Sequence, residues 1–196
     1  MNEATPTNSN QPESVYGEIG LWIAILADLT IFTLMFATVL YYRGFNPELY
    51  VQSQARLDQF IALINTLLLL TSSFFVVLSI HKARSWDWPM SGRFLLAGMA
   101  CGVGFIGMKF IEYGDKFEAG INLRTNEFFM FYFMTTILHL VHVLIGLGVL
   151  TIIRLGFPAR GVVAKGRLFA LEAGGVFWHM VDLLWVILMA VVYLAR

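Results

Sequence analysis

Six histidine and carboxylate side chains, inside long apolar stretches of this sequence or one residue beyond one, are candidates for chemistry, because a charge there is costly unless other groups satisfy it. The set is Asp28, Glu112, His139, His142, His179 and Asp182. Two pairs, His139 with His142 and His179 with Asp182, have the three-residue spacing that places side chains on one face of a helix. Histidines and carboxylates in this pattern can bind a metal, ligate a haem or relay protons.

Each of these chemistries competes with a structural role. The sequence has 4 histidines in all, which is few for a membrane di-iron centre. His142 and His179 could ligate a b-type haem, and Asp28 and Glu112 could relay protons with the histidines. The favoured alternative is that all six residues form a buried polar network that joins helix to helix, with His179 and Asp182 tying the last helix to its neighbours. We expect no catalytic, cofactor-binding or metal-binding residues, and the sequence contains no nucleophile triad, phosphate loop or CxxC motif.

The composition predicts an integral membrane protein. The chain has 196 residues, of which 58% are hydrophobic and only 13% are charged, too few to cover a soluble domain. Lysine plus arginine balances aspartate plus glutamate at 13 each, so the charge does not indicate a nucleic-acid partner. The single cysteine excludes an intramolecular disulfide.

Five apolar runs are long enough to cross the membrane, since ~30 Å of hydrocarbon requires about 20 helical residues. They cover about 20–42, 60–80, 94–111, 128–153 and 168–194. We expect an all-α membrane domain over residues 17–196, after a disordered polar tail over residues 1–16. Lys109, near the end of the third run, is expected to reach the membrane surface. Gly98 and Gly102 have the spacing of a close helix contact.

The basic residues predict the orientation of the bundle. On the N-terminal side lie Lys82, Arg84, Arg93, Arg154, Arg160, Lys165 and Arg167. On the other side lie Arg43, Arg56, Lys109, Lys116, Arg124 and Arg196. The two sides carry nearly equal numbers of basic residues. Residues 154–167, which contain basic residues and no acid, decide which side is predicted to be cytoplasmic. Because basic loops stay in the cytoplasm, we expect a cytoplasmic N-terminus and an external C-terminus.

The last two apolar runs contain the segments FWHMVDLLWVILMAVVYL, from Phe177, and HLVHVLIGLGVL, from His139. Both resemble helices of the haem–copper oxidase subunit III family. Its last helix has the pattern Trp/Tyr-Trp-His-Phe-Val-Asp-x-x-Trp, and FWHMVDLLWVILMAVVYL is similar, with Met180 in place of the phenylalanine. The matching residues are Trp178, His179, Asp182 and Trp185. HLVHVLIGLGVL, from His139, resembles the His-x-x-His-Val-x-x-Gly helix of the family, although Leu140 replaces a frequent glycine.

Three further segments resemble the family in the same order. GLWIAILADLTIF is similar to the helix with a carbodiimide-reactive carboxylate, and Asp28 occupies that position. Glu112 and Tyr113 match a Glu-Tyr pair that ends another helix, and NTLLLLTSS completes the set. The resemblance covers about residues 17–194 and implies the short, five-helix bacterial form. Longer members carry two more N-terminal helices, which help to form a lipid-holding cleft.

Within the family, YYRGFNPELY, NTLLLLTSS and TNEFFMFYFM are more similar to the nitric-oxide-reductase-associated (NorE-type) branch than to a main oxidase subunit.

The resemblance implies a non-catalytic, multi-pass subunit of a nitric oxide reductase or of a cytochrome c or quinol oxidase in the bacterial cytoplasmic (inner) membrane. Such a subunit binds no haem or copper of its own, stabilises the haem-bearing catalytic subunit and supports proton uptake. Its expected partners are that subunit and lipids, including a bound phospholipid, and no nucleic acid. The oxidoreductase activity is then expected of the complex rather than of this chain. The alternative is an electron carrier or enzyme with a haem of its own.

Overall fold

The computed structural model describes residues 15–157 and 165–195. Five of its helices are long and apolar enough to cross a membrane. They are α1 (Val15–Phe45), α3 (Gln59–Arg84), α4 (Trp88–Glu118), α5 (Glu127–Leu155) and α6 (Lys165–Met189), which continues as a π-helical segment, η1 (Ala190–Leu194). The predicted all-α bundle of five membrane helices is confirmed. The predicted tail, apart from residues 15 and 16, and the basic residues Arg160 and Arg196 lie outside the described residues.

A short helix that the hydropathy did not predict, α2 (Pro47–Gln54), connects α1 to α3. Pro47 stands at its first turn, where its fixed φ and missing N–H are tolerated. Tyr50 on α2 is buried against the ring of Phe128 on α5. Burial raises the pKa of Tyr50 to about 12.

The membrane helices extend beyond the apolar runs. The third run, predicted over residues 94–111, belongs to a helix that spans Trp88–Glu118. Its start is set by Asp87, whose carboxylate accepts a hydrogen bond from Met90 N, and Asp58 and Asn126 cap α3 and α5 in the same way. Polar side chains at these positions satisfy the free N–H groups of a first helical turn, so a helix can begin outside the apolar run.

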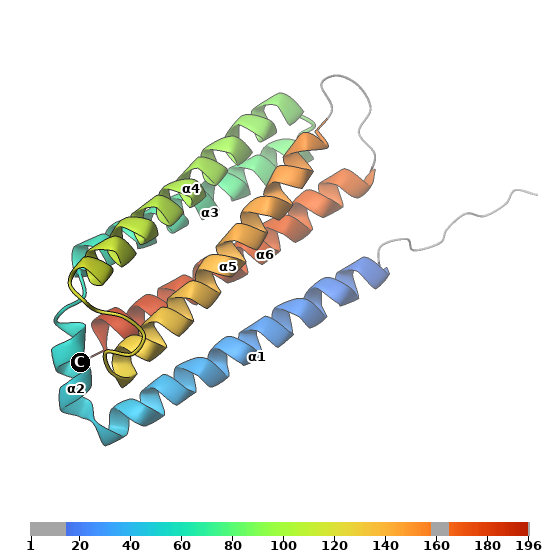
Figure 1. Cartoon of the computed structure of the whole chain (residues 1–196). Coiled ribbons are helices and arrows are strands. Elements are labelled where there is room, and N and C mark those ends of the chain that lie inside the picture. Colours follow the sequence, from blue (N-terminus) through green and yellow to red (C-terminus); the bar gives the residue numbers. More distant parts are fainter. Residues whose placement is uncertain (1–14, 158–164, 196) are drawn as a thin grey trace, which may run out of the picture.

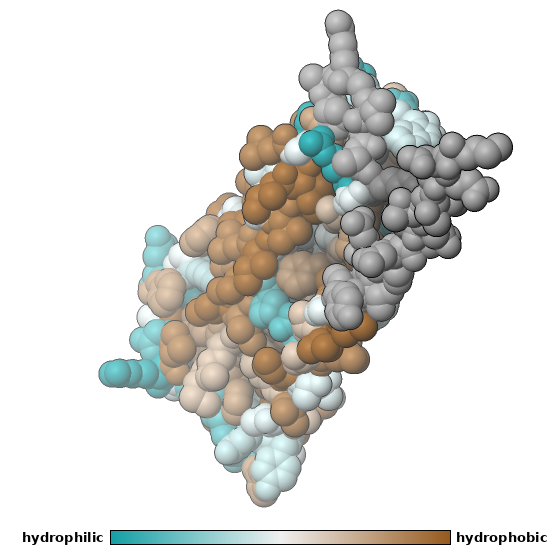
Figure 2. Space-filling model, turned by 90° about the vertical axis from the view of Figure 1, so that its right-hand side faces the viewer, coloured by the Kyte–Doolittle hydropathy of each residue, from teal (hydrophilic) through white to brown (hydrophobic). Residues whose placement is uncertain are grey.

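Helices α3, α4, α5 and α6 form a four-helix bundle, and α1 packs along α5 and α6 (Figure 1). The start of α1 and the end of η1 lie at opposite ends of the bundle (Figure 1). Figure 2 shows hydrophobic residues in a band along the helices and hydrophilic residues toward the ends, with a small hydrophilic spot inside the band. This is the surface of a multi-pass membrane protein. The helix arrangement is the same for either orientation, so the cytoplasmic N-terminus stays a prediction.

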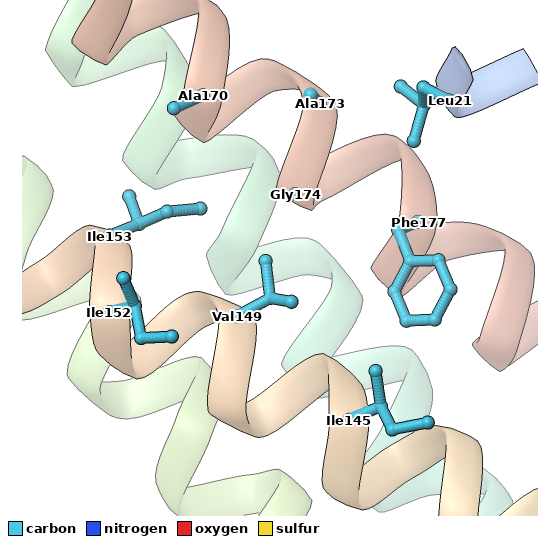
Figure 3. Close-up of a pocket in the computed structure, with 9 residues that line it drawn as sticks. All are labelled: Leu21, Ile145, Val149, Ile152, Ile153, Ala170, Ala173, Gly174 and Phe177. Carbon is cyan, nitrogen blue, oxygen red and sulfur yellow. The ribbon is translucent and has the colours of Figure 1, made fainter. Parts of the chain in front are cut away.

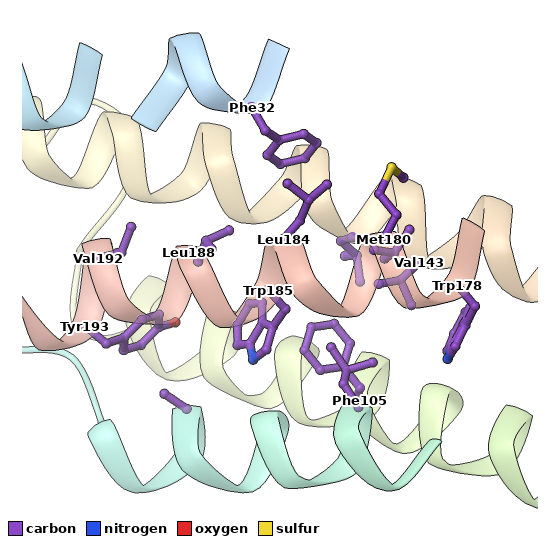
Figure 4. Close-up of a cluster of buried hydrophobic side chains, with 14 of the residues drawn as sticks. Phe32, Phe105, Val143, Trp178, Met180, Leu184, Trp185, Leu188, Val192 and Tyr193 are labelled. Carbon is purple, nitrogen blue, oxygen red and sulfur yellow. The ribbon is translucent and has the colours of Figure 1, made fainter. Parts of the chain in front are cut away.

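Trp178 of α6 is a buried core residue at one end of the cluster that Figure 4 shows. Its ring lies between Gly102 of α4 and Gly146 of α5, and a Cβ added to either glycine would lie 2.9 Å or 2.8 Å from a ring carbon. The ring Nε1 donates to Ser72 Oγ of α3 at 3.1 Å, and that hydroxyl donates to Gly98 O at 2.7 Å. Gly98 and Gly102, whose spacing predicted close packing, both lie at helix contacts.

Candidate functional site

An enclosed ion pair is formed by Lys109 and Glu112 on α4. Lys109 Nζ lies 2.8 Å from Glu112 Oε2, and each side chain is 1% exposed. Glu112 Oε1 accepts hydrogen bonds from the hydroxyls of Tyr193 at 2.6 Å and Tyr132 at 2.8 Å. Lys109 Nζ also donates to the Tyr193 hydroxyl at 2.9 Å. The pair therefore joins α4 to α5 and to η1, with its hydrogen-bonding groups satisfied.

The expectation that Lys109 reaches the membrane surface is wrong. Its ammonium lies 4.7 Å from the centroid of the Trp185 ring and between 5.4 and 5.7 Å from the centroids of three tyrosine rings. Aromatic faces attract a cation, and here they replace part of its lost hydration. The sequence signal was the three-residue spacing of Lys109 and Glu112, which places opposite charges side by side on a helix.

The end of η1 is held by side chains from three other segments. Gln54 donates to Val192 O at 2.8 Å, Gln59 to Tyr193 O at 3.4 Å and Arg43 to Ala195 O at 2.7 Å. The last carbonyls of a helix have no partner within it, so these donors satisfy groups that would otherwise be orphaned. They fix the position of Tyr193 against the ion pair.

Asp28 and His142 form a second polar contact, between α1 and α5. His142 Nε2 lies 3.5 Å from Asp28 Oδ1, with the side chains 13% and 24% exposed. The other ring nitrogen, Nδ1, lies 2.8 Å from Leu138 O on the same helix. The ring of His142 also meets the buried ring of Phe32 edge to face. This contact fastens α1 to α5 of the bundle.

A hydrophobic carbodiimide should modify Asp28. The reagent enters from the apolar phase, and Asp28 is a carboxyl within a membrane helix whose side chain is 24% exposed. Glu112 also lies in a membrane helix, but its side chain is only 1% exposed, so it should remain unlabelled. Peptide mass mapping after labelling in membranes tests this. An adduct confined to Glu48 or Glu118, which are exposed near helix ends, would contradict it.

A third polar contact joins α6 to α3. His179 Nδ1 and Ser73 Oγ lie within hydrogen-bonding distance. Asp182, one turn further along α6, is 7% exposed, and its Oδ1 has no hydrogen-bond partner among the described residues. His179 thus contacts the neighbouring helix α3, and the Asp182 carboxylate faces the same Ser73 hydroxyl, with its Oδ1 left without a partner in the described part of the chain.

His139 lies in the hydrophobic core. It is fully buried, and its ring centroid is 5.7 Å from that of Phe105 and 5.2 Å from that of Trp185. Neither ring nitrogen has a hydrogen-bond partner within residues 15–157 and 165–195. Three residues away on the same helix, His142 faces α1 instead.

The six residues singled out in the sequence are thus divided among separate places. Asp28 and His142 meet, Glu112 pairs with Lys109, and His179 meets Ser73. The two histidines considered as haem ligands contact different helices, α1 and α3. Among the described residues, no group of three or more histidine, cysteine, aspartate or glutamate side chains is arranged to hold a metal ion.

An apolar groove of about 390 Å³ lies between α1, α5 and α6 (Figure 3). Nine residues line it, and all of them are aliphatic or aromatic apart from one glycine. Phe177 and Leu21 stand at one end and Ile153 toward the other (Figure 3). A groove with this lining can accommodate hydrocarbon and offers no side-chain hydrogen bonds.

The chain is similar to known oxidase subunits over nearly its whole length. Quinol oxidase subunit 3 of Bacillus subtilis (strain 168) is 26% identical over 202 residues, which covers 99% of this chain and 97% of the relative. Cytochrome c oxidase subunit 3 of Thermostichus vulcanus is 27% identical over 186 residues, covering 90% and 86%. That of Synechocystis sp. (strain ATCC 27184 / PCC 6803 / Kazusa) is 26% identical over 175 residues, covering 89% and 74%. The family model for cytochrome c oxidase subunit III matches residues 15–195, so this chain belongs to the cytochrome c oxidase subunit III family.

Proposed function

We propose that this chain is subunit III of a cytochrome c or quinol oxidase in a bacterial cytoplasmic membrane. In this role it catalyses no reaction alone, packs beside the haem-bearing catalytic subunit, stabilises that subunit and helps to sustain its proton supply. The family match over residues 15–195 is the observation that carries the proposal. The relatives named above are quinol and cytochrome c oxidase subunits, which supports the same assignment.

The contacts of the polar side chains support a scaffolding role. Lys109 and Glu112 join α4 to η1, Asp28 meets α5 through His142, and α3 meets α6. Each of these contacts links two helices of the chain, and hydrogen bonds between side chains are among the contacts that hold membrane helices together. The chain therefore uses its buried polar groups to fix one helix arrangement that a partner can recognise. We propose that it binds no haem or copper of its own.

A bound phospholipid belongs to the same proposal. The groove of Figure 3 runs between helices that cross the membrane, and its lining is apolar. An acyl chain in this groove would fill the space that α1, α5 and α6 leave between them. Lipid extraction of the purified chain followed by mass spectrometry checks whether a phospholipid stays bound.

Deleting the chain should leave the haem-bearing partner assembled, with an unchanged haem spectrum. Reduction of oxygen should continue at first and then decline faster over repeated turnovers or at raised pH, where proton uptake is harder. The measurement is oxygen consumption by the purified complex over successive substrate additions, with and without the chain. Immediate loss of activity at unchanged haem content would contradict the accessory role. A Soret band in the purified chain would favour the alternative, a carrier with its own haem.

The NorE-type branch remains a prediction from the segments YYRGFNPELY, NTLLLLTSS and TNEFFMFYFM. The same purified complex distinguishes the branches. An oxidase partner consumes oxygen with quinol or cytochrome c as donor, whereas a nitric oxide reductase partner consumes nitric oxide. We propose the oxidase, because the family match and the named relatives support it.

A further inference from the structure

Two polar side chains in the bundle interior, Asn65 on α3 and His139 on α5, are completely buried, each being 0% exposed. The amide Oδ1 and Nδ2 of Asn65 and both ring nitrogens of His139 have no hydrogen-bond partner among the residues that the structure describes. Buried polar groups in folded proteins are nearly always hydrogen-bonded, because an unsatisfied group loses its water and gains nothing in return. These atoms therefore indicate a partner that is not part of the chain.

The two side chains come from helices on one diagonal of the four-helix bundle. Helix α3 packs against α4 and α6, and α5 packs against the same two helices, so α3 and α5 lie across the bundle from each other. Because Asn65 and His139 are completely buried, they point into the bundle from opposite sides. Sites for small ligands in helix bundles are built in this way, from side chains on facing helices.

Two hydrogen bonds set the register of α3 against α4. Ser79 Oγ and Ser91 Oγ lie 3.0 Å apart. Ser72 Oγ donates to Gly98 O at 2.7 Å. The second contact is 7 residues from the first on each helix (79 − 72 and 98 − 91), which is about two helical turns. The two antiparallel helices therefore stay in register along this stretch.

The same register brings Asn65 to the level of His139. Another 7 residues beyond the second contact place Asn65 opposite Phe105 of α4 (72 − 65 and 105 − 98). The ring of Phe105 packs edge to face against that of His139, with the centroids 5.7 Å apart. Phe105 is 13 residues before the end of α4, and His139 is 12 residues after the start of α5 (118 − 105 and 139 − 127). Because a short connection joins those two helix ends, the counts agree with one level (Figure 1).

Trp185 completes this level from α6. The centroid of its six-atom and five-atom ring system is 4.9 Å from that of Phe105 and 5.2 Å from that of His139. Its Nε1 donates to the hydroxyl of Thr66, the neighbour of Asn65, at 3.0 Å. Trp185 and Phe105 both belong to the cluster of Figure 4. We call Asn65, Phe105, His139 and Trp185, one residue from each helix of the bundle, the central layer.

We propose that the central layer is a binding site for ordered water, which connects the Asn65 amide to the His139 ring by hydrogen bonds. Water matches both ends, because an amide and a neutral imidazole each offer a donor and an acceptor, and water is both. A buried water typically makes about 3 hydrogen bonds to groups that would otherwise be unsatisfied. An ion does not fit, because the layer offers no opposite charge to replace its hydration. The water joins α3 to α5 across the bundle, and this inference does not depend on the proposed function.

Radiolytic hydroxyl labelling of the full chain in mild detergent tests for the water. An X-ray pulse converts bound water to hydroxyl radicals, which modify the side chains beside it, and mass spectrometry identifies these residues. Trp185 is the reporter and Trp178 the matched control. Both lie on α6, are 0% and 1% exposed, and donate Nε1 to a hydroxyl of α3. We expect Trp185 to be modified several-fold faster than Trp178, and equal rates overturn the proposal.

A double-mutant cycle tests the bridge itself. Asn65→Leu or His139→Leu alone removes one end and leaves the water and the other side chain short of a partner. Each single variant should therefore raise the unfolding equilibrium constant by about 5- to 30-fold. The double variant should be no less stable than either single variant, because both ends are then apolar. Its Trp185 should be modified no faster than Trp178.

Without the water the signs reverse. Asn65 and His139 would then be two separate unsatisfied groups, so leucine at either position would lower the unfolding equilibrium constant and the two effects would add. That result overturns the proposal. The control is His142→Leu, also on α5, because His142 faces Asp28 of α1 and its effect should add to that of Asn65→Leu. Coupling of Asn65 to His142 as strong as that to His139 also overturns it. If a variant does not fold, the labelling of the parent decides.

Discussion

Replacing Lys109 by methionine is expected to lower the free energy of unfolding by about 3–5 kcal/mol, because the substitution leaves the Glu112 carboxylate uncompensated in an enclosed site. Glu112 would retain its hydrogen bonds from Tyr132 and Tyr193, which stabilise a charge without neutralising it. The effect should be read from denaturant or thermal unfolding of the purified chain in mild detergent. Helix content should be unchanged before unfolding, since the substitution introduces no helix breaker.

Two variants control this result. Lys109→Met combined with Glu112→Gln removes both charges and keeps an acceptor for the two tyrosine hydroxyls, so most of the loss should be recovered. Arg84→Met breaks a pair of the same 2.8 Å length, between Arg84 and Glu172, whose side chains are 64% and 34% exposed. That change should cost about 0–1 kcal/mol. If Lys109→Met and Arg84→Met lower the free energy of unfolding equally, the ammonium of Lys109 reaches water.

Filling the glycine contacts around Trp178 should also destabilise the bundle. Gly146→Ala places a Cβ 2.8 Å from one ring carbon, and Gly102→Ala places one 2.9 Å from another. The ring cannot move away easily, because it is wedged between both helices and bonded to Ser72. Overpacking of this kind costs about 1–3 kcal/mol, so each variant should unfold at a lower temperature than the parent.

Gly148→Ala and Gly107→Ala are the matched controls, since a Cβ at either position meets nothing within 4 Å. Alanine favours a helix over glycine by about 1 kcal/mol, so these variants should be as stable as the parent or more stable. The informative result is that alanine lowers the stability at Gly102 and Gly146 and does not lower it at Gly107 and Gly148. If Gly146→Ala unfolds like Gly148→Ala, then α5 and α6 are further apart at Trp178 than the structure shows.

The sequence alone determined the number of membrane helices, because the energetic cost of spanning hydrocarbon sets the length of an apolar run. It also determined the family resemblance, because motifs such as Trp178-His179 and Glu112-Tyr113 occur in a set order along the chain. The short helix α2 was missed, because a helix outside the membrane has no such length requirement and its polar composition resembles a loop.

Only the tertiary structure decided which polar residues meet. A membrane helix is apolar on all sides, so the periodicity that reveals the buried face of a soluble helix is weak here. His139 and His142 share one side of α5 by spacing, yet one packs in the core and the other reaches α1. Lys109 was expected to reach the membrane surface because its helix was expected to end near it. In the folded chain α4 continues to Glu118, and η1 brings Tyr193 over the ammonium. Contacts of this kind depend on where distant helices lie, and hydropathy along one helix carries no information about its neighbours.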